Sequence, residues 1–247
     1  MPHESALQAY FRRSDDFHRY LLSDARRVRD FRNLIRANSR FFGHRVLDLG
    51  CGGGVLGFLL ENGGRHYLGV DANPDMVREA RRTAKERKSR CRFVLEDVTR
   101  LRVRGKFDTV ALLGNGICHL PTHDVQRMLR ALRKHVEPGS TFVVEYRDVV
   151  RLVAERRWKT TGRFVIVQGR PKGRLVVTPK GVDTEKGVFP QSTLLEGFSR
   201  PVRWGHAIWS PFILEPLMKA EGWGLARRVP KLRDRSVVVD VYRFKGQ

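Results

Sequence analysis

The amino-acid sequence predicts an α/β domain whose sheet is mostly parallel and carries helices on both faces. Short apolar segments alternate with amphipathic, helix-like segments over residues 41–150. The middles of the apolar segments are apolar at successive positions, which is typical of strands that are buried on both faces of a sheet. A glycine cluster follows the first of these strands directly, so the strand runs into a tight turn and then a helix.

The elements of this domain are expected in a regular order. Residues 17–38 carry apolar side chains at near-helical spacing among charges, and they predict an amphipathic helix before the first strand. The expected strands cover residues 44–50, 67–71, 91–95, 107–114 and 141–145. The expected helices cover residues 54–60, 74–88 and 125–136, and Pro74 suits the first turn of the second one.

The pattern changes after residue 150. Residues 164–168, 175–178 and 191–199 read as short strands, which predicts a small antiparallel insertion over the carboxyl edge of the sheet. A helix is expected over residues 210–221, with Pro216 inside it, and a closing strand over 236–244. We therefore divide the chain into an N-terminal helical cap (1–40), a core (41–150), a β insertion that caps the substrate (151–208) and a final helix and strand of the core (209–247).

The composition fits one large folded domain. The chain has 247 residues, of which 41% are hydrophobic, and no apolar run approaches the roughly 18 residues that a membrane span needs. The first twenty residues are polar and charged, unlike a signal peptide. Cys51, Cys91 and Cys118 form neither a disulfide framework nor a metal-ligand spacing. We expect a cytoplasmic protein without a metal or a membrane partner.

The net charge of +22 is the most unusual bulk property of the chain. Basic residues are spread over the whole sequence, with local runs such as residues 227–231. A positive field attracts phosphate-rich partners and raises their encounter rate, but it does not determine the fold. The charge therefore leaves two alternatives open, namely an RNA partner or a basic protein without one.

The segment Val-Leu-Asp-Leu-Gly-Cys-Gly-Gly-Gly at residues 46–54 predicts a ligand site. Its alternate glycines allow a sharp turn and a close approach of the backbone to a ligand, and the following helix points its amides at that ligand. Two features favour a sulfonium nucleoside over NAD. Val55 stands where the pattern G-x-G-x-x-G, begun at Gly50, needs glycine, and Asp48 precedes the loop, where a carboxylate attracts an ammonium group.

Two further acids end the next two strands. Asp71 lies 17 residues after Gly54, near the offset at which a carboxylate reaches a ribose diol. Asp97 ends the third strand, where a side-chain acceptor reaches an adenine amino group. Alone, each acid is equally well explained as a solvated charge, but three at successive strand ends indicate a nucleoside site at the sheet edge where open α/β folds bind ligands.

This constellation resembles the class I S-adenosylmethionine-dependent methyltransferase superfamily over residues 40–148, and residues 210–244 fit the end of its fold. The resemblance implies a Rossmann-like core and S-adenosyl-L-methionine as the cofactor. It places Asp48, Gly50 and Gly52 at the methionine end, Asp71 at the ribose, and Asp97 with Val98 at the adenine. The other cofactor contacts that it implies are Cys51, Ala72, Leu113 and Asn115.

The segment after the fourth strand bears on the methyl acceptor. Residues 112–121 lack the Asn-Pro-Pro-Tyr type of signature found in enzymes that methylate base amines, and they resemble the glycine and sarcosine N-methyltransferases instead. In that family an arginine beyond the fifth strand binds a carboxylate, and Arg147 falls at the matching place, with Tyr146 where the family has histidine. The candidate catalytic residues are His119, Tyr146 and Arg147, although an ion pair of Arg147 with Asp148 and a packing role for His119 remain open.

Three functions are consistent with these features. The first is a methyltransferase for a small amine that carries a carboxylate. The second is a tRNA or rRNA methyltransferase, which the positive charge favours. The third is a protein that binds S-adenosyl-L-methionine without catalysis, which the intact acids of the cofactor site argue against. The sequence leaves the oligomeric state open.

Overall fold

The computed structural model describes residues 25–159, 161–167, 170–195, 201–230 and 236–246. Its main sheet has seven strands in the order β10-β11-β5-β4-β1-β2-β3. Their bounds are Arg45–Leu49 (β1), His66–Asp71 (β2), Arg92–Leu95 (β3), Thr109–Leu112 (β4), Thr141–Arg147 (β5), Trp223–Pro230 (β10) and Val237–Phe244 (β11).

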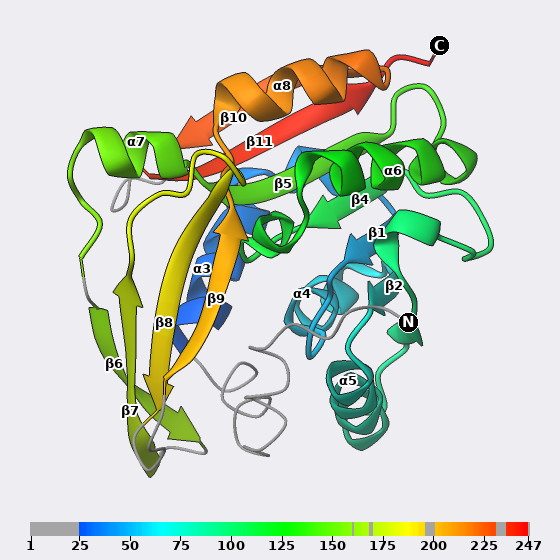
Figure 1. Ribbon diagram of the computed structural model, residues 1–247. Helices are drawn as coiled ribbons and strands as arrows, with labels where there is room; N and C mark the ends of the chain where they lie inside the picture. The colour runs from blue at the N-terminus through cyan, green and yellow to red at the C-terminus, as the bar shows by residue number, and fades with distance from the viewer. Residues whose placement is uncertain (1–24, 160, 168–169, 196–200, 231–235, 247) are drawn as a thin grey trace.

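The first five strands pair in parallel, while β11 runs antiparallel to both β5 and β10. The mostly parallel sheet that the sequence predicts is therefore confirmed (Figure 1). Because β1 lies between β4 and β2, and β3 lies beyond β2, the carboxyl ends of these four neighbouring strands meet at one edge.

Helices cover both faces of this sheet. Val46 of β1 faces a layer formed by α3 (Ala25–Ala37), α4 (Val55–Leu60) and α5 (Pro74–Glu86). Leu47, the next residue, faces the opposite layer, formed by α6 (Thr122–Leu132) and α8 (Pro211–Ala220). Successive side chains of a strand point to opposite faces, so the apolar run of β1 supplies both cores.

Short helices complete the core. The remaining α-helix, α7 (Val149–Ala154), leads from β5 toward the second sheet. The 3₁₀ helices are η1 (Ser39–Phe41), η2 (Glu61–Gly63), η3 (Val98–Arg100), η4 (Gly116–His119) and η5 (Arg133–His135). Of these, η3 follows β3 and η4 follows β4, so both lie at the carboxyl edge of the sheet.

A second, antiparallel sheet follows α7. Its four strands lie in the order β6-β7-β8-β9, with bounds Thr161–Val167, Arg170–Pro179, Val188–Leu195 and Val202–Ala207. The antiparallel insertion is confirmed, although the sequence predicted three strands, and residues 196–199 of the third lie outside the described residues. The sheet reaches the carboxyl edge of the core through β9, where the His206 ring lies 5.6 Å from the His119 ring of η4.

The helical cap expected at residues 1–40 is described from residue 25 onward. There, α3 packs Phe31 and Leu34 into the same apolar layer as α4, so this part of the predicted cap belongs to the core. Residues 17–24 of the predicted first helix lie outside the described residues. Among the described helices, none is long and apolar enough to cross a membrane.

Candidate active site

The glycine loop lies between the end of β1 and the start of α4. Gly50, Gly52 and Gly54 all have positive φ, at 66°, 53° and 84°. A Cβ on Gly54 would lie 2.5 Å from a ring carbon of Phe93, whereas a Cβ on Gly52 would meet nothing within 4 Å. The loop therefore has one side packed on the protein and one open side that a side chain would fill.

Asp71 connects the end of β2 to this loop. One carboxylate oxygen accepts the backbone N–H of Gly52 at 2.8 Å, and the other accepts the N–H of Asn73 at 2.9 Å. The Asn73 side chain in turn caps α5 by accepting the N–H of Asp75. The sequence folds this way because an aspartate at a strand end and an asparagine before Pro74 both accept free backbone donors. The half-buried Asp71 carboxylate is thereby fixed beside the open face of Gly52.

Asp48 lies beneath the loop and is 4% exposed. Its carboxylate accepts a hydrogen bond from the Tyr67 hydroxyl. Burial, followed by the charge of Asp48, raises the pKa of Tyr67 well above its usual value. Burial and then the charges of Asp48 and Asp71 do the same to the pKa of Cys51, so this thiol stays protonated and is no nucleophile. The site thus carries buried negative charge directly under the glycine loop.

The other predicted cofactor residues lie along the same edge. Asp97 precedes η3 and accepts the backbone N–H and the hydroxyl of Thr99, both at 2.8 Å, and the half-buried Val98 follows it. Leu113 is buried next to β4, Ala72 is exposed after β2, and Asn115 has a positive φ of 64° before η4. All the predicted cofactor positions therefore stand at the carboxyl ends of the four neighbouring strands β4, β1, β2 and β3.

These residues fit S-adenosyl-L-methionine as a group. The open face of Gly52 admits a ligand close to the backbone, which a Cβ would prevent. The carboxylates beneath and beside the loop suit an ammonium group and a ribose diol. They would repel a diphosphate, which S-adenosyl-L-methionine does not contain. The chemistry of the donor set therefore matches a positively charged nucleoside better than a dinucleotide.

The segment after β4 forms the second side of the site. The Gly114 N–H donates to the buried Glu145 carboxylate at 3.0 Å, and the Arg147 N–H donates to Asn115 at 2.9 Å. Trp209 donates its indole N–H to the carbonyl oxygens of Ile117 and Leu120 at 3.0 and 3.2 Å. The short helix η4 is thus held from both β5 and the chain before α8.

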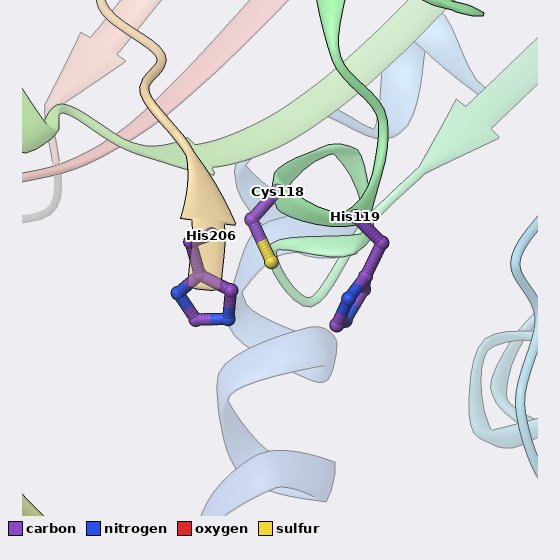
Figure 2. Close-up of side chains that lie close together, drawn as sticks. All are labelled: Cys118, His119 and His206. Atoms are coloured by element: carbon purple, nitrogen blue, oxygen red, sulfur yellow. The ribbon is translucent and has the colours of Figure 1, made fainter. Parts of the chain in front are cut away.

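Three chemically active side chains meet at η4 (Figure 2). Cys118 and His119 come from η4 and His206 from β9, and their ligand-type atoms lie within 4.8 Å of one another. Cys118 is buried, His206 is half-buried and His119 is exposed, so the cluster opens on one side. Figure 2 shows the Cys118 sulfur pointing between the two imidazole rings.

The surroundings of this cluster disfavour positive charge. Burial, followed by the charges of His119 and Arg147, lowers the pKa of His206 to about 3. Burial raises the pKa of Cys118, although the charge of Arg147 opposes this. The His206 imidazole is therefore neutral at pH 7, and the charge of Arg147 acts on both His206 and Cys118.

The structure corrects the assignment of Tyr146 as a catalytic residue. Tyr146 is fully buried, and its hydroxyl donates to the Asp240 carboxylate at 2.8 Å. Because side chains alternate along β5, Tyr146 points into the layer of α6 and α8, away from Glu145 and Arg147. Burial and then Asp240 raise the pKa of this phenol. Tyr146 is thus part of a core network and does not reach the site.

Sequence reasoning placed His119 and Arg147 at the acceptor side but missed the arrangement around them. It did not identify His206, or Gln191, whose amide nitrogen lies 3.0 Å from His206 Nδ1. Asp148, the other residue considered beside Arg147, caps α7 by accepting the N–H of Arg151. No local pattern signals the contact of β9 with η4, since it joins distant parts of the chain.

The sheet order, the glycine loop at the carboxyl edge and the helices on both faces are those of the Rossmann-like methyltransferase fold. Residues 46–139 match the model of a family described as a methyltransferase domain. That match covers the glycine loop and the strands β1 to β4.

Curated relatives share part of this chain. Mouse (Mus musculus) glycine N-methyltransferase is 30% identical over 119 residues, which are 42% of this chain and 41% of the relative. A ubiquinone biosynthesis O-methyltransferase of Xanthomonas campestris pv. campestris is 32% identical over 133 residues, or 53% of this chain and 54% of the relative. The chain thus spans about half the length of the curated relatives it matches.

Solved structures share the fold over nearly all of the chain. A protein of Pyrococcus horikoshii OT3 superposes with a TM-score of 0.71 and 24% identity, covering 96% of this chain and 99% of that one. CalS10, an amino pentose methyltransferase of Micromonospora echinaspora solved with S-adenosylmethionine bound, superposes with a TM-score of 0.63 and 19% identity, covering 98% of each chain. At these identities the likeness concerns the fold alone.

Proposed function

We propose that this protein is an S-adenosyl-L-methionine-dependent methyltransferase that acts on a small amine carrying a carboxylate. The observation that carries the proposal is the open face of Gly52 beside the fixed carboxylate of Asp71. The match of residues 46–139 to a methyltransferase domain supports it, because this segment contains the loop and both acids that flank it.

In this proposal, different residues of the site bind different parts of the cofactor. The buried charge of Asp48 attracts the ammonium group of the methionine end, which approaches the backbone at Gly50 and Gly52. Asp71 receives the ribose hydroxyls, and Asp97 with Val98 borders the adenine. The remaining contacts come from Cys51, Ala72, Leu113 and Asn115.

When bound, S-adenosyl-L-methionine supplies an electrophilic methyl group on a positively charged sulfur. An acceptor nitrogen would take this methyl group through its lone pair, S-adenosylhomocysteine would leave with the electrons of the S–C bond, and the proton of the methylated nitrogen would pass to solvent. The chain's own contribution is to align the acceptor in line with that bond and to exclude water. Such positioning lowers barriers by about 7–11 kcal/mol in favourable intramolecular reactions.

Arg147 is the proposed anchor for the acceptor. It follows Glu145 at the end of β5, and its charge acts on Cys118 and His206. A guanidinium binds a carboxylate through two parallel hydrogen bonds, which fixes direction as well as distance. His119 borders the same space. The partial similarity to mouse glycine N-methyltransferase supports an amine with a carboxylate, although that similarity covers less than half of either chain.

RNA methylation is a second candidate, and the net charge of +22 favours it. Lysine and arginine side chains that neutralise phosphates strengthen binding in a strongly salt-dependent way. The second sheet meets η4 at the acceptor side, where the His119 and His206 rings lie 5.6 Å apart, and this contact favours a small acceptor over a folded RNA.

A methyl-transfer screen separates these candidates. The full chain is incubated with S-adenosyl-L-methionine labelled in its methyl group, and with amino acids, small amines, tRNA or rRNA as acceptor. We expect label in one or more amines that carry a carboxylate, and none in RNA. Label in RNA alone would refute the small-acceptor proposal. Cofactor binding without label in any acceptor would favour a protein that binds S-adenosyl-L-methionine without catalysis.

A further inference from the structure

The cluster of Cys118, His119 and His206 contains three side chains that bind metals, although the sequence shows no metal-ligand spacing. Two of them are consecutive in η4, and the third comes from β9 of the second sheet. Within the described residues, this is the group of histidine, cysteine or acidic side chains whose ligand atoms converge closely enough to hold an ion. Because these side chains come from elements far apart in the sequence, their proximity is not explained by the local sequence.

The distances suit a metal after a small adjustment. The three ligand atoms lie within 4.8 Å of one another. Zinc bonds of about 2.0–2.3 Å in a tetrahedral arrangement place ligand atoms roughly 3.3–3.6 Å apart. The side chains must therefore close by about an ångström, which small rotations of their χ angles achieve. The sulfur already points between the two rings (Figure 2).

Partners outside the cluster hold the ligands in place. The Gln191 amide nitrogen lies 3.0 Å from His206 Nδ1, and the Trp204 ring lies 4.2 Å from the His206 ring. A half-turn of that amide presents its oxygen to a proton on Nδ1, which leaves the lone pair of Nε2 free. Metal-binding histidines commonly donate their second ring N–H to such a carbonyl. On the other side, Trp209 fixes the backbone on both sides of Cys118 and His119.

From this geometry we infer that Cys118, His119 and His206 bind a zinc ion and leave its fourth position open. One thiolate and two imidazoles are a donor set that favours zinc over magnesium or calcium, which prefer oxygen ligands. Three protein ligands with an open position are typical of zinc that binds a further molecule, whereas structural zinc sites have four.

The charge of Arg147 decides what suits the open position. A second cation beside a guanidinium is unfavourable, but zinc binding displaces the thiol proton and leaves Cys118 as a thiolate. With the thiolate bound, zinc keeps one positive charge, which an anionic oxygen at the fourth position neutralises. This last step rests on the proposed function, because the carboxylate of the proposed acceptor is such an oxygen.

Metal binding by the full chain tests the inference directly. The purified protein is stripped with a chelator and titrated with zinc in competition with a chromophoric chelator. We expect the wild type to bind one zinc ion per chain. We expect the zinc affinity of Cys118→Ala and of His206→Ala to be lower than that of the wild type by about 100-fold or more. The matched controls Cys91→Ala and His123→Ala remove a thiol and an exposed imidazole outside the cluster and should bind zinc as the wild type does.

Cobalt(II) gives a second, spectroscopic readout of the same site. Replacement of zinc by cobalt in the wild-type chain should produce the near-ultraviolet band of a thiolate bound to cobalt. The absence of both zinc uptake and this band, or their persistence in Cys118→Ala, would overturn the inference. Zinc uptake without methyl transfer would refute only the proposed function, whereas methyl transfer by a chain that takes up no zinc would refute only the metal site.

Discussion

The glycines of the loop after β1 meet two different requirements. Packing requires glycine at position 54, because a Cβ on Gly54 would lie 2.5 Å from the Phe93 ring. Gly52 has a positive φ of 53°, but a Cβ there would enter open space. The same residue type is therefore needed at one position for packing and at the other for access to the backbone.

Substitution of Gly52 tests this distinction. We expect Gly52→Ala to lower the affinity for S-adenosyl-L-methionine about tenfold or more, because the new methyl group occupies the ligand's approach, and to destabilise the fold by about 1–2 kcal/mol through its left-handed backbone. The control Gly64→Ala has the same backbone demand, with φ of 69° and an equally open Cβ, at an exposed turn. Calorimetric titration of both variants with S-adenosyl-L-methionine measures the effect. Equal affinities of the two variants for this ligand would contradict the proposed cofactor site.

Tyr146 belongs to a buried network at the opposite face of β5. Asp240 is fully buried and accepts from Tyr146, Tyr242 and Arg228 at 2.8 to 3.1 Å. A buried carboxylate is stable only when its hydrogen bonds are complete. The tyrosine therefore contributes to stability and not to chemistry.

Tyr146→Phe should lower the free energy of unfolding by about 1–3 kcal/mol, the range for a hydrogen bond to a charged group. The turnover of the folded enzyme should stay within about twofold of the wild type, since the hydroxyl does not reach the site. Chemical denaturation and steady-state kinetics measure the two quantities, and Tyr242→Phe serves as a control in the same network. A large loss of turnover with unchanged stability would restore a catalytic role.

At the scale of elements, the sequence predicted those with strong periodicity and missed those that depend on context. The strands β1 to β5 were predicted from their apolar runs, α6 and α8 from helix-like runs of residues, and α5 also from Pro74 in its first turn. The strand β10 was missed, because Arg227 and Arg228 read as a basic run. In the structure, Arg228 turns inward to Asp240 and Arg227 outward to the Ala37 carbonyl, as alternation along an edge strand requires.

The two sides of the site differ in the same way. The positions of the proposed cofactor residues could be predicted, because Gly52, Asp71 and Asp97 follow the ends of regular strands. The acceptor side could not, because His206 and Gln191 meet His119 only when the second sheet folds onto η4. Contacts between elements distant in the chain leave no periodic pattern in a single sequence.

Arg147 is the last residue of β5, and its substitution tests the proposed binding of the acceptor. Arg147→Lys keeps the charge but loses the two parallel hydrogen bonds to a carboxylate. We expect the KM for an acceptor that carries a carboxylate to rise about tenfold, while the Kd for S-adenosyl-L-methionine stays unchanged. Arg151→Lys, at an exposed position on α7, is the matched control. An unchanged KM would show that another residue anchors the acceptor.

For the whole molecule, the net charge attracts polyanions, whereas the fold determines what binds at the active site. The chain has 48 basic and 26 acidic residues, so any polyanion is attracted to it regardless of the active site. Attraction of this kind is screened by salt, whereas contacts of buried and half-buried groups at the site are screened far less. The salt dependence of binding and of turnover can therefore be separated.

We expect tRNA to bind in low salt and to lose roughly a thousandfold or more in affinity between 50 and 200 mM salt, as contacts with several phosphates predict. Methyl transfer to a small acceptor should change by about twofold or less over the same range. Filter binding and the labelled transfer assay measure the two effects. Parallel losses of binding and transfer would indicate that RNA is the acceptor.

The central claim is that S-adenosyl-L-methionine binds at the carboxyl ends of β4, β1, β2 and β3. A crystal structure of the chain with S-adenosylhomocysteine tests it most directly. The account predicts the ligand's amino-acid end against the open face of Gly52, its ribose at Asp71 and its adenine beside Asp97 and Val98. A complex in which this ligand lies elsewhere, or in which these strand ends hold a different molecule, would contradict it.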